Sequence, residues 1–122
     1  MALTRKCVFA NTIKAAEAVE ANRFIDLAGE YPDAQGDYAY GVTVAAAAKD
    51  EHVAVDVLGT TIVQSTAAAI AVGDQLMVAA PGAKNVDGGK VLKAAANKVV
   101  VARAITAVPA AGGLLEIALI PN

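Results

Sequence analysis

The chain has 122 residues, a length typical of one domain. Its formal net charge of −2 and the lack of a Lys/Arg cluster beyond Arg5-Lys6 argue against nucleic acid as a partner. No apolar run approaches the roughly 20 residues of a membrane span, and the N-terminal residues lack the apolar core of a secretory signal. We therefore expect a protein made in the cytoplasm, with neither a membrane nor nucleic acid as its partner.

Small side chains dominate the apolar part of the sequence. Hydrophobic residues make up 57% of the chain, but aromatic residues only 4%, and there is no Trp. The core must then consist of Val, Ile, Leu and Ala, each of which buries little area. This composition favours stabilisation through assembly into a homo-oligomer.

The N-terminal segment allows two interpretations. Residues 12–22 are good helix formers, with Ile13, Ala16 and Val19 spaced as a narrow apolar stripe. Alternatively, residues 1–20 form an extended arm that becomes ordered only against a neighbour. We divide the chain into an N-terminal arm, residues 1–20, and a β-domain, residues 21–122.

From Arg23 onward the pattern changes to short runs of period two, separated by turn-forming residues, which predicts strands. The first run covers residues 24–27. In the next, Tyr38, Tyr40, Val42 and Val44 alternate with smaller residues and should share one face of a sheet.

A valine-rich run follows at residues 52–58. Val53, Val55 and Val57 should face one side, while Asp56 marks the side that is more exposed to water. Gly59 then permits a bend before a further run at residues 61–64.

The second half of the chain predicts four more strands. Residues 75–78 follow a turn at Gly73-Asp74, and residues 90–93 follow a loop rich in Gly and Pro. Apolar runs at 99–105 and 114–120 are joined by residues 109–113, which indicates a hairpin of two central strands. About seven short strands without long helices predict one all-β domain, either a β-sandwich or a partly closed β-barrel.

No residues suggest catalysis. His52 is the single histidine, and a Ser/His/Asp arrangement would require it to lie near Ser65. The carboxylates are spread over different turns and show no paired pattern. Cys7 has no base or helix terminus to activate it. We therefore predict that the protein is not an enzyme.

No cofactor or metal site is indicated either. Gly88-Gly89-Lys90 is similar to part of a phosphate loop, but Lys84 and Val91 stand where the Walker pattern requires Gly and Ser or Thr. A glycine turn before an edge strand explains the three residues better. The lone Cys7 has no partner for a disulfide or a metal site.

The order of motifs resembles that of the capsid cement family, the small decoration proteins of tailed bacteriophages. The resemblance covers about residues 21–120, and Lys49-Asp50 and Ala102 stand where the family pattern has glycine. The matching segments are residues 21–27, 40–43, 53–57 with Gly59, 70–74, 89–91, 102–104 and 115–119.

The resemblance implies a protein on the outer surface of the virion capsid, often a trimer, that staples neighbouring subunits of the major capsid protein. It implies no cofactor. We expect the N-terminal segment to contact the capsid, because it mixes apolar and basic side chains: Leu3, Arg5, Lys6, Val8 and Phe9. Deletion of residues 3–9 should then abolish head binding and leave the fold intact.

Two other functions stay open. One is a different non-enzymatic virion component, such as a head-fibre base or a minor tail protein, which copy number per particle would distinguish. The other is a small β-barrel ligand-binding module, which would need a pocket lined by aromatic and convergent polar groups. Three tyrosines and two phenylalanines make such a pocket poor.

Overall fold

The computed structural model describes residues 3, 5–66, 69–108 and 113–120. Its regular elements are all strands, apart from one 3-10 turn, η1 (Ala83–Asn85), so the predicted all-β class is confirmed for the part described. The strands are β1 (Cys7–Lys14), β2 (Phe24–Ile25), β3 (Gly41–Thr43), β4 (His52–Gln64), β5 (Gln75–Val78), β6 (Val91–Lys93), β7 (Ala102–Ala104) and β8 (Leu114–Leu119).

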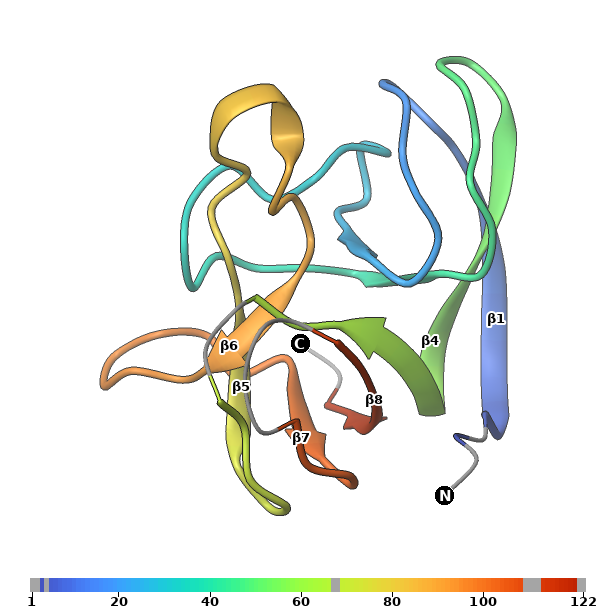
Figure 1. Cartoon of the computed structure of the whole chain (residues 1–122). Coiled ribbons are helices and arrows are strands. Elements are labelled where there is room, and N and C mark those ends of the chain that lie inside the picture. The colour runs from blue at the N-terminus through green and yellow to red at the C-terminus, as the bar shows by residue number, and fades with distance from the viewer. Residues whose placement is uncertain (1–2, 4, 67–68, 109–112, 121–122) are drawn as a thin grey trace.

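One long strand, β4, belongs to both halves of the molecule. The strand order is β2-β3-β4-β8-β7-β5-β6, with β1 also paired to β4. The first part of β4 pairs with β1 and β3, and its last five residues pair with β8. Figure 1 shows β4 curving between these two groups of strands.

Gly59 lies where β4 passes from one group of strands to the other. Its φ is +103°, and a Cβ atom at this position would lie 2.3 Å from the carbonyl oxygen of Lys6. Only glycine tolerates both conditions. The bend predicted at this residue therefore takes place inside a continuous strand.

The second part of β4 forms a partly closed barrel with β8, β7, β5 and β6. An isolated parallel bridge joins Ser65 to Val91, and the Thr66 N–H donates to the Val91 carbonyl at 3.0 Å, which brings the end of β4 back to β6. The main core lies within this curl and consists of Phe24, Ala39, Val42, Val63, Ile70, Leu76, Val78, Val91, Val101, Ala102, Ala104, Val108, Leu115 and Ile117.

The predicted pairing of the last two strands is confirmed. β7 and β8 are antiparallel, and each has a second neighbour, β5 for β7 and β4 for β8. Both are therefore central strands. Residues 109–112 of the predicted turn lie outside the described residues.

A second, smaller core lies between the β1-β4-β3-β2 sheet and the loops beside it. Its members are Ala15, Val19, Ile25, Tyr31, Ala47, Val53 and Val55. The helix predicted for residues 12–22 is wrong, because Cys7–Lys14 is a strand whose pairing with β4 outweighs the local helix propensity. The division at residue 20 stays a prediction, although Ala15 and Val19 already lie in this core.

The strand predicted from Tyr38 to Val44 is shorter than expected. Only Gly41–Thr43 is a strand, and the predicted single face is wrong, because Val42 enters the main core while Tyr40 packs against the smaller one. This segment passes between two cores and buries side chains on both sides. In the turn that lacks the family glycine, Asp50 has a φ of +72°.

Candidate functional site

Four of the five predicted contact residues, all except Leu3, lie on β1 or just before it. Within the described residues, β1 pairs with β4 alone, and Figure 1 shows it at the outer edge of the molecule. Its residues 8–12 are all exposed to solvent. β1 is thus an edge strand with one side of its main chain left open.

Exposed apolar side chains gather at the start of this strand. Val8 is 74% and Phe9 51% exposed, and the register of β1 on β4 shifts between Cys7 and Ala10, which is a β-bulge. Phe9 stands opposite Leu58, which is also exposed. Val8, Phe9 and Leu58 are called the edge patch below, and the described part of the chain leaves all three exposed.

A charged contact fastens the segment before β1 to the body. The Arg5 Nε donates to Asp56 Oδ2 at 2.5 Å, and a second guanidinium nitrogen donates to Oδ1 at 3.3 Å. Asp56 is fully buried, and the Thr61 hydroxyl donates to the same carboxylate at 2.7 Å. This Arg5–Asp56 contact is called the clasp.

The predicted faces of residues 52–58 are confirmed, but Asp56 itself is an exception. Val53 and Val55 are buried, and the other side of the strand is exposed at His52, Ala54 and Leu58. Asp56 lies on this more exposed side and is nevertheless fully buried, opposite Val42 of the main core. A carboxylate is tolerated there because Arg5, distant in sequence, reaches it from the N-terminal segment.

The clasp changes the pKa values of its members. Burial raises the pKa of Asp56, but hydrogen bonds from Arg5 and Thr61 outweigh burial, and the net pKa is lowered. The hydrogen bond to Asp56 raises the pKa of Arg5. Burial, and next a hydrogen bond to Asp56, raises the pKa of the half-buried Cys7 thiol, so the geometry does not activate it as a nucleophile.

The structure separates the five predicted contact residues by role. Val8 and Phe9 belong to the edge patch, and Arg5 forms the clasp. The main chain of Lys6 pairs with Thr60 through N–H···O bonds of 3.2 and 2.9 Å. Leu3 lies elsewhere, in an apolar groove of about 510 Å³ that is lined also by Val72, Ile105, Thr106, Ala107 and Leu114.

The structure indicates that the predicted deletion of residues 3–9 would also lower the stability of the fold. It would remove Arg5 and leave the buried Asp56 carboxylate without its cation. It would also remove the Lys6 pairing with Thr60 and the first part of β1. Single side-chain substitutions on β1 are therefore the cleaner test of a contact.

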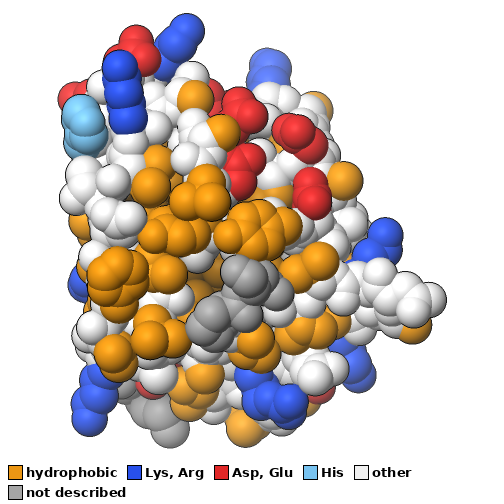
Figure 2. All heavy atoms as spheres, turned by 180° about the vertical axis from the view of Figure 1, so that it is seen from behind, with side chains coloured by type: hydrophobic (Ala, Val, Ile, Leu, Met, Phe, Trp, Pro, Cys, Tyr) orange, Lys and Arg blue, Asp and Glu red, His pale blue; other side chains and the backbone are white. Residues whose placement is uncertain are grey.

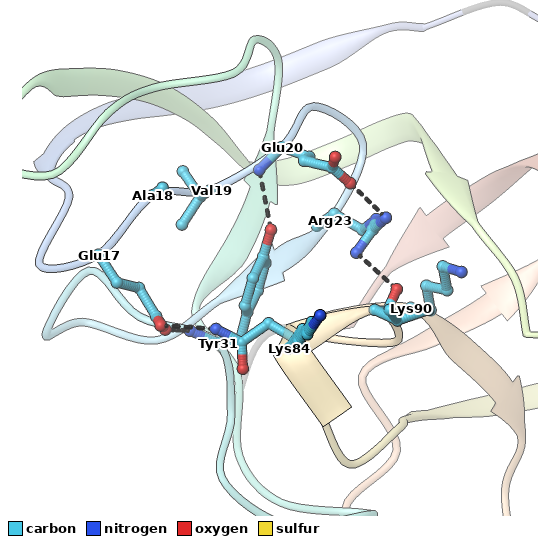
Figure 3. Close-up of a pocket in the computed structure, with 10 residues that line it drawn as sticks. Glu17, Ala18, Val19, Glu20, Arg23, Tyr31, Lys84 and Lys90 are labelled. Atoms are coloured by element: carbon cyan, nitrogen blue, oxygen red, sulfur yellow. Dashed lines mark hydrogen bonds and ion pairs between the residues drawn. The ribbon is translucent and has the colours of Figure 1, made fainter. Parts of the chain in front are cut away.

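A cavity of about 580 Å³ lies between residues 17–20 and the loop that follows η1 (Figure 3). Arg23 lies beneath it, buried, and donates to Gln64 Oε1, the Gly88 carbonyl and Glu20 Oε2. The Tyr31 hydroxyl accepts from the Glu20 N–H at 2.8 Å. These polar groups serve the protein itself, so the cavity offers little free bonding capacity to a ligand.

The His and Ser that a catalytic Ser/His/Asp arrangement would require lie far apart in the structure. His52 begins β4 and is exposed, whereas Ser65 follows the far end of that strand and is buried. The Ser65 hydroxyl is bonded to the main chain of Gly113. Among the residues described, no three His, Cys, Asp or Glu side chains form a metal-binding group.

Gly88 and Gly89 serve packing. A Cβ at Gly88 would lie 2.4 Å from the Tyr31 ring, and one at Gly89 would lie 2.2 Å from the Phe24 carbonyl oxygen. Lys90 forms an ion pair with Asp87 at 3.2 Å. The interpretation as a glycine turn before a strand therefore fits, and the phosphate-loop similarity does not extend to the structure.

Apolar side chains are also prominent on the face of the molecule that is turned away from the viewer in Figure 1. Figure 2 shows them gathered across the middle of that face, below a group of acidic side chains. No helix in the described part of the chain is long and apolar enough to cross a membrane. The described residues form a small all-β domain in which one edge strand, β1, has no strand neighbour on its outer side.

The phage cement protein family matches residues 4–119, and the chain belongs to this family. It is a family of structural phage proteins associated with the virion capsid, which confirms the resemblance seen in the sequence. The match includes most of the N-terminal segment, which the sequence comparison had left outside. No similar protein was found among curated proteins.

A solved structure has the same fold. The chain is similar to the N-terminal base of the head fiber protein gp8.5 of bacteriophage phi29, with a TM-score of 0.65 and 19% sequence identity. The likeness covers 92% of this chain and 93% of the other. At this identity the comparison establishes a shared fold.

Proposed function

We propose that the protein binds the outer surface of the phage head and holds neighbouring subunits of the major capsid protein together, without catalysis. Membership of the cement family supports this role. The observation that carries the contact site is the edge patch, in which Val8 and Phe9 are 74% and 51% exposed on a strand that the chain leaves uncovered. Exposed apolar groups on an open strand edge favour association with another protein.

The five residues predicted to contact the capsid take different parts in this proposal. Val8 and Phe9 supply apolar area, and the exposed side chain of Lys6 supplies positive charge. Leu3 acts from its separate groove. Arg5 positions β1 by means of the clasp. Many modest contacts of this kind, repeated over one head, favour the assembled capsid over its separated subunits.

A homotrimer at local three-fold positions is part of the proposal. The small-residue, low-aromatic composition gives each copy limited buried area, which oligomer formation would increase. Light scattering on the purified protein, and on protein released from decorated heads, measures the oligomer number in each condition.

The test is co-sedimentation with expanded, undecorated heads. The wild-type protein should bind at a fixed ratio to the capsid subunit. A double variant, Val8→Ser with Phe9→Ser, should bind at least about tenfold more weakly because it removes the apolar area of the patch. Val86→Ser is the matched control, since Val86 is 59% exposed but lies beside η1, away from β1. Wild-type binding by the double variant would contradict the site.

A head-fibre base is the second candidate. The likeness to the phi29 head fiber base over most of both chains favours it. Copy number per particle separates the two functions, because a cement protein is present at every equivalent position of the head and a fibre base at fewer. A ligand-binding module is less favoured, because protein groups already occupy the hydrogen bonds of Arg23 in the cavity.

A further inference from the structure

The main chain of β1 presents a row of groups that point away from β4. The Ala15 N–H donates to the Glu51 carbonyl at 2.8 Å, which fixes the side from which β4 is bonded. Because bonding alternates along an antiparallel strand, Asn11 and Ile13 also face β4, and Ala10, Thr12 and Lys14 point outward. The Thr12 N–H is accordingly bonded to the side-chain oxygen of Asn11 at 2.8 Å, not to β4.

The other strand edges are covered by the chain itself. The Phe24 N–H on β2 donates to the Gly89 carbonyl at 2.8 Å. On β6, Val91 forms a parallel β-bridge with Ser65. Within the described residues, β1 is thus the long strand whose outer edge has no neighbouring strand.

The positive charge near β1 indicates what kind of segment could pair with its outer edge. Residues 1–16 contain Arg5, Lys6 and Lys14 but no Asp or Glu, although the whole chain has a net charge of −2. Lys6 and Lys14 flank the exposed residues 8–12. Two copies joined antiparallel through their β1 edges would bring Lys6 of one copy toward Lys14 of the other, which is unfavourable. Charge complementarity therefore favours a different, acidic segment.

We propose that the outer edge of β1 accepts an extended, acidic segment of the major capsid protein as an added strand, an inference that rests on the proposed function. The segment bonds to the outward groups of Ala10 and Thr12, since the loop at Gly29 packs against the carbonyl of Lys14, and it displaces the Asn11 side chain from the Thr12 N–H. An apolar residue of the segment packs on the edge patch. Its carboxylates meet Lys6 and Lys14. Main-chain bonds give the affinity, and the side-chain contacts give the register.

The sharpest test changes one outward N–H group. In Thr12→Pro, the group that an added strand would need is absent, while the bonds from β1 to β4 remain. In Thr12→Ala, the N–H is kept, so this variant is the matched control. In co-sedimentation with undecorated heads, the proline variant should bind about tenfold or more weakly than the wild type, and the alanine variant should bind equally. Thermal unfolding of both variants verifies that they are folded.

Charge reversal gives a second test that does not depend on a proline. Lys14→Glu should weaken head binding, most at low salt, because it repels the carboxylates. Lys93→Glu, an exposed residue on β6, should not. If Thr12→Pro and Lys14→Glu both bind as the wild type does, strand addition is overturned while the cement function stands. If the wild-type protein does not bind heads, both the proposed cement function and strand addition are contradicted. Self-association of the wild type that Thr12→Pro abolishes would overturn the choice of partner.

Discussion

The barrel half and the β1 side of this molecule differ in whether their sheet edges are covered by the chain. In the barrel, Ser65 meets Val91, so the sheet curls back on itself and encloses the main core. On the other side, β1 leaves one edge open and keeps Val8 and Phe9 in water. The barrel half therefore encloses the main core, and the β1 side carries the surface that we propose contacts the capsid.

The two halves are joined by shared core residues, such as Phe24 and Val42, and by β4 and the N-terminal segment. β4 runs through both, and Gly59 lets Lys6 and Val8 approach its main chain. The clasp between Arg5 and Asp56 adds a charged tie from the N-terminal segment into the body. The comparison predicts that substitutions in the barrel affect stability strongly, those in the clasp affect it moderately, and those in the edge patch affect it little.

The largest effect is expected for Leu115→Ala in β8. Leu115 is 0% exposed, and loss of a buried leucine side chain costs about 2–5 kcal/mol of unfolding free energy. Its neighbour Leu114 is 48% exposed, so Leu114→Ala should change stability by about 0.5 kcal/mol or less. Urea unfolding of both variants measures the difference. Equal losses would mean that the barrel does not hold the core as described.

Arg5→Ala should have an intermediate effect. It leaves Asp56, which is fully buried, with Thr61 and Cys7 but without its cation. Because the Arg5 side chain is 47% exposed and solvent screens it, the expected loss is about 1–3 kcal/mol, below that of a fully buried pair.

Lys6→Ala is the control for the clasp, because the Lys6 contacts to Thr60 involve the main chain of Lys6, which the substitution keeps. Thermal unfolding gives the stability of both variants. Hydrogen exchange of the β1 amides then shows whether the strand opens without the clasp, which should raise its exchange rate. Unchanged exchange in Arg5→Ala would mean that β1 is held by its pairing with β4 alone.

The clasp also predicts a dependence of stability on pH. The folded-state pKa of Asp56 is lowered, so the unfolded chain binds a proton more readily than the folded one. The stabilisation is fully present above the ordinary aspartate pKa of about 4 and is lost as the pH falls through the folded value. Thermal unfolding between pH 2.5 and 7 should show this loss, and Asp56→Asn should reduce it. An identical acid profile in that variant would contradict the prediction.

The smallest effect on stability is expected in the edge patch. The double variant Val8→Ser with Phe9→Ser should unfold within about 1 kcal/mol of the wild type, because Val8 is 74% and Phe9 51% exposed. Such a result would separate the role of the edge patch in binding from any role in stability, since the same variant is expected to lose head binding. A large loss of stability would instead show that the patch serves the fold.

The sequence alone carried the parts of the structure that depend on local signals. Turn residues and period-two runs predicted the all-β class, and the β7–β8 pair was predicted from two apolar runs joined by a Gly/Pro segment. The order of the motifs also indicated the cement family, to which the chain belongs. Each of these signals is contained within a few neighbouring residues.

Only the tertiary structure decided the N-terminal strand and the place of Asp56. Residues 12–14 favour a helix locally, but β4, from distant sequence, offers them a strand partner. Asp56 follows the alternation of β4, yet it is buried because Val42 and Arg5 approach it from far along the chain. Strand pairing and burial of charge are set by residues distant in sequence, and these contacts leave no local periodicity from which they could be predicted.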